Sequence, residues 1–271
     1  MKTNRLYLLA VAAVAMLSMN SCQRMAKAVV DKAIKEVTNH NYEDSEEWGK
    51  VVTRDLELGD FSRVRIAGVV KFVLSQDSVC HIQAYGNEKR IEAYDITVED
   101  GMLRAELKMN KDKITRNTPA ITLYVNAPMI QELRVSGAGD LEQIDSFSQD
   151  EALEIEVNGA GDLDINDMET KSLEVSINGA GDVDIEHLRC QENVELKLSG
   201  AGDMDATIEC RDLEASVNGA GDLDLNVKCD VLRVSCSGAG DIDLKGECRK
   251  LIKNIGRASD LDMEDLLVTE P

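Results

Sequence analysis

Gly159-Ala160-Gly161-Asp162 is one of six intact copies of a Gly-Ala-Gly-Asp motif in the second half of the chain. A degenerate seventh copy reads Arg257-Ala258-Ser259-Asp260. The aligned aspartates of the seven copies are separated by 22, 20, 21, 19, 19 and 19 residues. A repeat of this length is typical of stacked coils in a solenoid.

The residues around the motif alternate in polarity. Leu153, Ile155 and Val157 precede it on one face of an expected strand, and Leu163 and Ile165 resume the apolar pattern after it. Each repeat therefore predicts two short strands that meet at a corner, where positive φ angles and close backbone approach exclude a β-carbon. The corner glycines are Gly137, Gly139, Gly159, Gly161, Gly179, Gly181, Gly200, Gly202, Gly219, Gly221, Gly238 and Gly240.

A bent ribbon of this kind cannot bury its single apolar face alone. Neighbouring copies must stack with parallel strands about 4.8 Å apart. We predict an all-β fold, a parallel β-helix (β-solenoid), and a right-handed one because parallel crossovers almost always have that hand. A helical solenoid is disfavoured, since no copy carries an amphipathic helical pattern.

The N-terminus resembles a bacterial lipoprotein signal. Lys2 and Arg5 precede an apolar run, residues 6–17, that is too short for a permanent membrane span, and Cys22 follows shortly after it. In such signals the cysteine is diacylated and becomes the new N-terminus. Residues 1–21 are thus predicted to be a signal peptide and Cys22 the lipidated residue, with an ordinary cleaved secretory signal as the alternative.

The chain is strongly acidic, with 51 acidic against 30 basic residues and a net charge of −21. Removal of residues 1–21 takes away two basic residues and leaves a net charge of −23. Such a chain repels nucleic acid and anionic lipid surfaces, so attachment to a membrane would have to come from the acyl anchor.

Three regions are expected after the signal. Residues 22–50 are a tether with a short amphipathic helix at 25–37. Residues 51–135 are expected to form irregular first coils, with a separate β-domain as the alternative, and a hairpin turn is predicted at Asp100-Gly101. Residues 136–271 form the repeated coils of the same β-helix.

Several motifs of the chain, taken together, resemble a known family. Gly59-Asp60-Phe61, then residues 64–68, the Asp100-Gly101 hairpin and the repeated Ser/Asn-Gly-Ala-Gly-Asp are similar to the Bacteroidetes envelope proteins called putative auto-transporter adhesin, head GIN domain, a domain of unknown function. The resemblance covers roughly residues 52–255. It implies a right-handed β-helix and an exported location, and it offers no catalytic residues to carry over.

Paired carboxylates are the strongest candidates for chemistry. Each coil places two of them on its outer side, and hard cations such as calcium prefer such oxygen ligands. The 19-to-22-residue spacing instead favours turn-capping for the first aspartate and solvation for the second. The calcium candidates are Asp162, Asp164, Asp182, Asp184, Asp203, Asp205, Asp222, Asp224, Asp241 and Asp243.

Two further columns recur with the repeat. Serine or asparagine precedes the first glycine of every intact copy, and we expect these side chains to hydrogen-bond from coil to coil at a buried corner. Cys190, Cys210, Cys229 and Cys248 recur at 20, 19 and 19 residues, which predicts a stack of thiols, with disulfides as the alternative. Cys236 replaces an apolar residue of the repeat and is expected in the core.

Catalysis finds little support in the sequence. The three histidines are His40, His81 and His187, the last expected in an outer loop, and none lies in a known catalytic motif. We therefore expect a non-enzymatic envelope protein whose acidic solenoid binds an unknown protein or glycan, or acts as a scaffold, without a cofactor. The alternative is a polysaccharide-active lyase or hydrolase, by analogy with other β-helices.

Overall fold

The computed structural model describes residues 42–108 and 120–270, and Asp44–Pro271 form one compact unit. The expected signal peptide, Cys22 and the helix at 25–37 lie outside the described residues. In the part of the chain that is described, no helix is long and apolar enough to cross a membrane.

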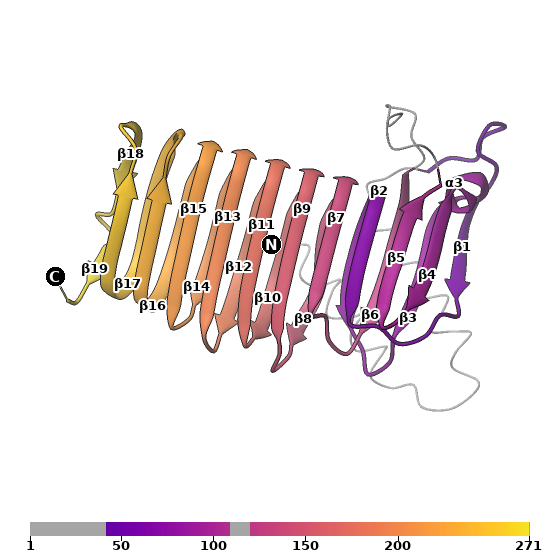
Figure 1. Cartoon of the computed structure of the whole chain (residues 1–271), viewed down its shortest axis with the longest axis horizontal. Helices are drawn as coiled ribbons and strands as arrows, with labels where there is room; N and C mark the ends of the chain where they lie inside the picture. Colours follow the sequence, from indigo (N-terminus) through magenta and orange to yellow (C-terminus); the bar gives the residue numbers. More distant parts are fainter. Residues whose placement is uncertain (1–41, 109–119, 271) are drawn as a thin grey trace, which may run out of the picture. The chain divides into compact units, whose positions relative to one another are not determined.

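The unit is built almost entirely of strands, which follow one another in a row (Figure 1). In chain order the elements are β1 (Val51–Leu56), β2 (Arg63–Gln76), β3 (His81–Asn87), α3 (Glu88–Glu92), β4 (Tyr94–Glu99), β5 (Met102–Leu107), β6 (Ala120–Ala127), β7 (Glu132–Ala138), β8 (Leu141–Ser148), β9 (Ala152–Ala160), β10 (Leu163–Thr170), β11 (Ser172–Ala180), β12 (Val183–Cys190), β13 (Asn193–Ala201), β14 (Met204–Glu209), β15 (Asp212–Ala220), β16 (Leu223–Cys236), β17 (Ala239–Ile255), β18 (Ala258–Asp262) and β19 (Leu266–Val268).

The repeated coils form a β-solenoid of about 7 turns, as the sequence predicted. Each coil has one strand on each of two faces, and the strands of the two faces run in opposite directions (Figure 1). Face 1 consists of β7, β9, β11, β13, β15 and the second halves of β16 and β17. Face 2 consists of β8, β10, β12, β14, the first halves of β16 and β17, and β19.

Within each face the strands are parallel and equivalent positions of the repeat lie side by side. Ile177 pairs with Val157 on one side and with Leu198 on the other, and Asn178 pairs with Asn158 and Ser199. Coils of unequal length keep this register because the extra residues are absorbed by irregularities, one of them between Ile165 and Asp167. Side chains at one repeat position therefore form columns along the solenoid.

Residues 51–135 combine solenoid strands with antiparallel hairpins. β2 bends at Gly68, so its first half pairs with β7 on face 1 and its second half with β8 on face 2. β1, β3 and β6 pair antiparallel, as do β4 and β5. The turn between β4 and β5 has positive φ at Asp100 (50°) and Gly101 (71°), which confirms the predicted hairpin.

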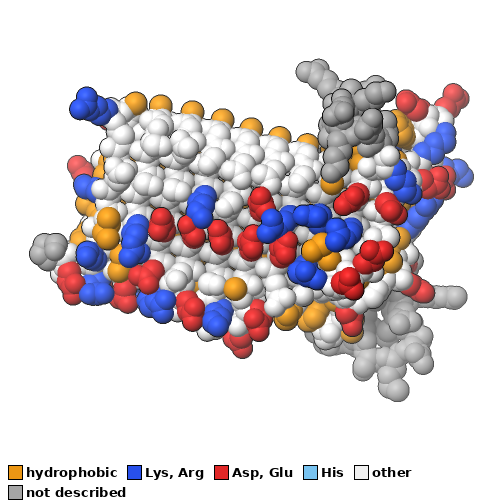
Figure 2. All heavy atoms as spheres, in the orientation of Figure 1, with side chains coloured by type: hydrophobic (Ala, Val, Ile, Leu, Met, Phe, Trp, Pro, Cys, Tyr) orange, Lys and Arg blue, Asp and Glu red, His pale blue; other side chains and the backbone are white. Residues whose placement is uncertain are grey.

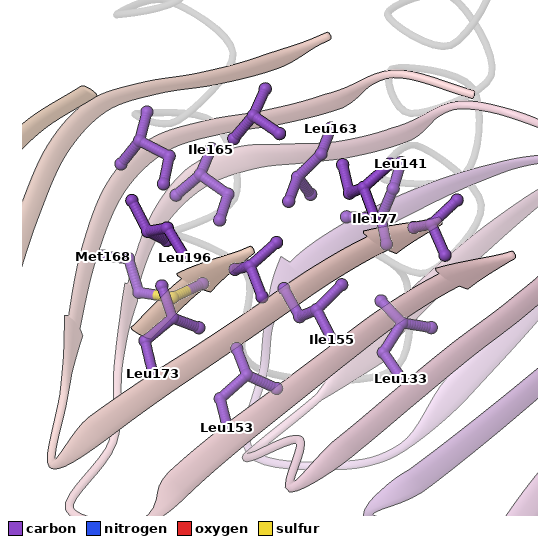
Figure 3. Close-up of a cluster of buried hydrophobic side chains, with 14 of the residues drawn as sticks. Leu133, Leu141, Leu153, Ile155, Leu163, Ile165, Met168, Leu173, Ile177 and Leu196 are labelled. Atoms are coloured by element: carbon purple, nitrogen blue, oxygen red, sulfur yellow. The ribbon is translucent and has the colours of Figure 1, made fainter. Parts of the chain in front are cut away.

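The core lies between the two faces and is filled by the inward positions of the alternating pattern (Figure 3). Ile155 from face 1 and Ile165 from face 2 are each 1% exposed. Met168, further along β10, is also buried in this core. Cys236 is buried in this core, as predicted. Burial of these aliphatic columns, at about 25 cal/mol per Å² of apolar surface, is the main favourable term in the stability of the solenoid.

The glycine corner is where successive coils approach most closely. Gly179 has φ +150°, and a β-carbon on it would overlap the carbonyl oxygen of Gly159 in the preceding coil. Each of the other corner glycines meets the preceding coil in the same way. The N–H of the second glycine, for example Gly161, then donates to the carbonyl of the next coil's alanine, here Ala180, at 3.0 Å. Two glycines per corner are thus required by contact between backbones.

Replacing Gly179 with alanine should lower the free energy of unfolding by about 2 to 6 kcal/mol, because left-handed strain and overpacking each cost about 1 to 3 kcal/mol. The matched control is Ala180→Ser at the neighbouring exposed position, which should stay within about 0.5 kcal/mol of the wild type. Urea unfolding followed by circular dichroism measures both. Equal effects of the two substitutions would contradict the corner geometry.

Candidate functional site

The corner aspartates link each coil to the next. The Oδ1 atom of Asp162 accepts a hydrogen bond from the backbone N–H of Asp182 at 3.0 Å, and Asp182 accepts from Asp203 at 2.9 Å. Asp203 and Asp222 continue the series at 2.8 Å each, the last reaching Asp241. The sequence predicted turn-capping within one coil, whereas the structure shows capping of the following coil. One oxygen of each of these aspartates is therefore occupied by the backbone.

The second carboxylates form a row on the outer side of face 2. Within face 2 they are paired neighbours in adjacent strands, which lie about 4.8 Å apart. The row consists of Glu142, Asp164, Asp184, Asp205, Asp224, Asp243 and, in β18 of the last coil, Asp262. At such spacing neighbouring carboxylates repel each other by about 3 kcal/mol at an effective dielectric of 20.

Lysines neutralise the row at two places. Lys71 Nζ lies 2.6 Å from Glu142, and Lys245 Nζ lies 3.2 Å from Asp224 and 2.8 Å from Asp243. Repulsion is thus relieved where a lysine reaches the row. The three carboxylates between Glu142 and Asp224 have no ion pair with any residue in the described ranges.

We call this stretch the acidic face and define it by the unpaired row carboxylates of three successive coils together with the corner aspartates of the same coils. Its residues are Asp162, Asp164, Asp182, Asp184, Asp203 and Asp205. Partial burial, followed by repulsion from Glu142 and Asp184, raises the pKa of Asp164 above the ordinary aspartate value. Partial burial and the charges of Asp224 and Asp184 also raise the pKa of Asp205. The acidic face therefore holds negative charge at a cost in stability.

The calcium candidates stand in rows and do not converge on a point. Among residues 42–108 and 120–270, no three or more Asp, Glu, His or Cys side chains are arranged to hold a metal ion. Because one oxygen of each corner aspartate from Asp162 to Asp222 already accepts a backbone hydrogen bond, these residues offer fewer free ligands than the sequence indicated.

The serine and asparagine column is exposed, so the prediction of a buried corner is wrong. The expected hydrogen bonds between coils are present at two steps: Asn178 Nδ2 donates to Asn158 Oδ1 at 3.2 Å, and Ser237 Oγ donates to Asn218 Oδ1 at 2.9 Å. The neighbouring corner alanines are also largely exposed. Figure 2 shows a line of apolar side chains along one edge of the unit, above rows of acidic and basic side chains.

The four repeated cysteines lie at the second corner of successive coils, and Cys229 pairs directly with Cys248. All six described cysteines are free thiols. Burial raises the pKa of Cys229 to about 12 and raises the pKa of Cys210 as well, so both remain protonated at neutral pH. A protonated thiol is a poor nucleophile and a poor metal ligand.

The sequence interpretation missed that this column begins before the cysteines. Thr170 pairs with Cys190, and its Oγ1 donates to the Glu151 carbonyl at 2.6 Å, much as Cys190 Sγ donates to the Lys171 carbonyl at 3.2 Å. This position at the second corner requires a small side chain that can donate a hydrogen bond to a carbonyl of the preceding coil. Cys190 meets this requirement, and the burial of Cys248 and the partial burial of Cys210 and Cys229 at the same corner give the column a structural role.

The histidines do not form a catalytic group. His187 lies in β12 and is exposed, where the sequence had indicated a loop. His81 Nε2 is 3.6 Å from Asp55 Oδ1 at the surface of β3, and His40 lies outside the described residues. Two depressions on the described surface are open to solvent, and one of them is lined by residues 260–264 of the last coil.

Comparison with known proteins identifies the class. The family described as "Putative auto-transporter adhesin, head GIN domain" matches residues 60–207 and 184–270, and the chain belongs to this family. No curated protein matches the chain.

Solved structures share the fold. The crystal structure of a putative adhesin from Bacteroides fragilis is 22% identical, with a TM-score of 0.66, and the match covers 78% of this chain and 96% of that one. A putative adhesin from Parabacteroides distasonis is 17% identical (TM-score 0.64; 79% and 98% covered), and a putative lipid binding protein from the same species is 18% identical (TM-score 0.56; 79% and 98% covered). At these identities the likeness establishes the fold alone.

The raised pKa of Asp164 predicts a gain of stability when its charge is removed. The raised pKa belongs to the folded state, so the charged carboxylate destabilises the fold above that pKa and the penalty disappears as the pH falls through it. Asp164→Asn should raise the free energy of unfolding at pH 7 by up to about 0.5 kcal/mol, since exposed charges are screened. The gain should vanish near pH 3.

Asp224→Asn is the matched control, because Lys245 already compensates the charge of Asp224. This control should give no gain at either pH in denaturant titrations. A gain for Asp224→Asn equal to that for Asp164→Asn would show that only net charge matters and would refute the local account of the raised pKa.

Proposed function

We propose that this chain is an exported, lipid-anchored protein of the cell envelope whose acidic solenoid acts as a non-catalytic binding module. The family name and two of the similar structures refer to adhesins, which supports a binding role. The lipoprotein-like stretch that ends at Cys22 supports export and an acyl anchor. The proposed location is the outer membrane, on its periplasmic or outer face.

The observation that carries the binding role is the acidic face. Parallel strands present its carboxylates at a fixed spacing of about 4.8 Å, and the stacked core and the hydrogen bonds between corners hold them in place. Lysines pair with Glu142 on one side of the acidic face and with Asp224 and Asp243 on the other, while the three coils between them keep their charge. A rigid, unpaired row of negative charge attracts and orients a basic partner surface.

The partner that fits best is a protein surface rich in lysine and arginine. Guanidinium and ammonium groups can each take one or two carboxylates of the acidic face, whereas a neutral glycan would gain nothing from the charge. The raised pKa values of Asp164 and Asp205 favour the same partner, because a cation would relieve the repulsion that raises them. Interfaces of this kind associate fast and weaken as salt is added.

Binding to immobilised poly-lysine at about 150 mM salt tests the surface. The triple variant Asp164→Asn, Asp184→Asn, Asp205→Asn should bind at least about fivefold more weakly than the wild type, because it removes three unpaired charges. The matched control changes the net charge equally on face 1, through Glu174→Gln, Glu195→Gln and Glu214→Gln, and should lose less than about twofold.

Equal losses for the two triple variants would reject the acidic face as the binding surface. Release of sugar products from a panel of polysaccharides would overturn the non-catalytic part of the proposal in favour of a lyase or hydrolase.

Cys22 provides the test of the anchor. In cells fed an alkyne-tagged fatty acid, the wild-type chain should carry the tag and sediment with membranes, and Cys22→Ala should lose both properties, because the acylated thioether can no longer form. Ser21→Ala, which keeps the cysteine and a small residue before it, is the control and should remain labelled. An untagged wild-type chain, or a tagged Cys22→Ala, would contradict the lipoprotein assignment.

A further inference from the structure

The last coil leaves its outer strand edges without a neighbour. Residues 250–255 of β17 pair with β16 on one side, and β18 and β19 pair only with β17. No described strand pairs with the other edge of any of the three, which lie at the yellow end of Figure 1. An edge with free N–H and C=O groups is a template for another strand.

Apolar side chains gather at the same end. Ile252 is 42% exposed and Leu267 is 59% exposed, and these are two of the three exposed large hydrophobic side chains in the described ranges. Core columns also reach the surface here: Leu232 is fully buried, while its neighbour Leu251 in the last coil is only half-buried. The core thus continues up to an uncovered surface.

Charge is divided between the two faces of this coil. Residues 249–257, on face 1, contain four basic residues and no acidic one. Residues 258–270, on face 2, contain five acidic residues and no basic one. The basic set is Arg249, Lys250, Lys253 and Arg257, and the acidic set is Asp260, Asp262, Glu264, Asp265 and Glu270.

Lys253 stands at an inward position of this end. It pairs with Val234 of the preceding coil, and its Nζ lies 3.3 Å from the Met263 sulfur on face 2. Lys253 and Met263 are therefore at the same height along the strands. A lysine in an inward position discourages an apolar or basic edge from docking and favours an acidic one.

We propose that the last coil is an interface for a second copy of this chain, related by a two-fold axis parallel to the strands. This rotation places face 1 of one copy beside face 2 of the other. Because the strands of the two faces run in opposite directions, the meeting edges are antiparallel and can exchange hydrogen bonds (Figure 1). The pairing occurs twice, once on each side of the axis, as a two-fold interface requires.

The same rotation makes the charges complementary. It preserves height along the strands, so Lys253 of one copy faces the partner copy's Met263 region, which is flanked by Asp262 and Glu264. The alternative axis, perpendicular to both faces, would place face 1 against face 1 and bring basic residues together. The interface would also add a strand beside Ile252 and Leu267, which stand at outward positions of the last coil and now lie at an open edge.

The mass of the full chain in mild detergent, measured by analytical ultracentrifugation at about 150 mM salt, tests the proposal. We expect a dimer at about 10 µM, and carbodiimide cross-links between Lys253 and Asp262 or Glu264. Mixing unlabelled and nitrogen-15-labelled copies shows by mass spectrometry whether a cross-link joins two copies. Lys253→Glu should weaken association at least tenfold, and the triple variant Lys253→Glu, Asp262→Lys, Glu264→Lys should restore it.

Lys228→Glu, which makes the same charge change two coils earlier and on the outer side, should leave association unchanged. Circular dichroism checks folding, and if Lys253→Glu does not fold, the wild-type mass and the mixed-isotope cross-links decide. A monomer at about 100 µM would overturn the proposal. Cross-links from Lys253 only to residues 1–41 of the same copy, or only to a different protein, would also overturn it. None of these outcomes bears on the poly-lysine test, because the acidic face lies on other coils.

Discussion

At the glycine corner, the backbone of one coil passes so close to the backbone of the next that no side chain fits between them. This contact fixes the position of every coil relative to its neighbour. Once the corners coincide, the strands on both faces fall into register, and aliphatic side chains of equivalent positions stack into a continuous core. The corner aspartates reinforce the same alignment, since each accepts a hydrogen bond from the following coil. The outer surface is a consequence of this alignment.

Direct stacking has an electrostatic cost wherever the repeated residue is charged. On face 2 a single acidic position of the repeat becomes a row of carboxylates, which lysines compensate at Glu142, Asp224 and Asp243 and leave uncompensated in the three coils between Glu142 and Asp224. Face 1 handles the same problem differently: Arg134 lies between Glu132, Glu154 and Glu156, with side-chain contacts of 2.5 to 2.9 Å. Because basic residues pair with the acidic positions of some coils and leave three successive coils of the row bare, uncompensated negative charge is concentrated there.

Much of this structure could be predicted from the sequence, and the limits have physical causes. Period-two alternation around Gly159 marked the inward residues and the strand on each side of the corner, and Asp100-Gly101 marked a hairpin, because both patterns depend on local geometry. The second corner was harder to place, since glutamine, threonine and cysteine occupy it in different coils and share only the ability to cap a carbonyl. His187 was misplaced because irregular pairing after Ile185 hides the strand period.

Contacts between coils were the least accessible to sequence reasoning. Asp162 accepts a hydrogen bond from Asp182, and this contact depends on how the next coil is stacked on it. Asn158 is exposed because its side chain points toward solvent at the glycine corner. Likewise, the position of the acidic face depends on where Lys71 and Lys245 contact the row of carboxylates. These two lysines are far apart in the sequence, so their contacts with one row could not be foreseen from it.

Equal corners also make the coils interchangeable. A coil that begins at Gly200 and one that begins at Gly219 present the same contacts above and below, so a duplicated or deleted unit of 19 residues would rejoin the stack without a mismatch. The length of the solenoid can therefore change in evolution by increments of about 4.8 Å. Tandem duplication within the gene would alter length while leaving both ends, and whatever they bind, intact.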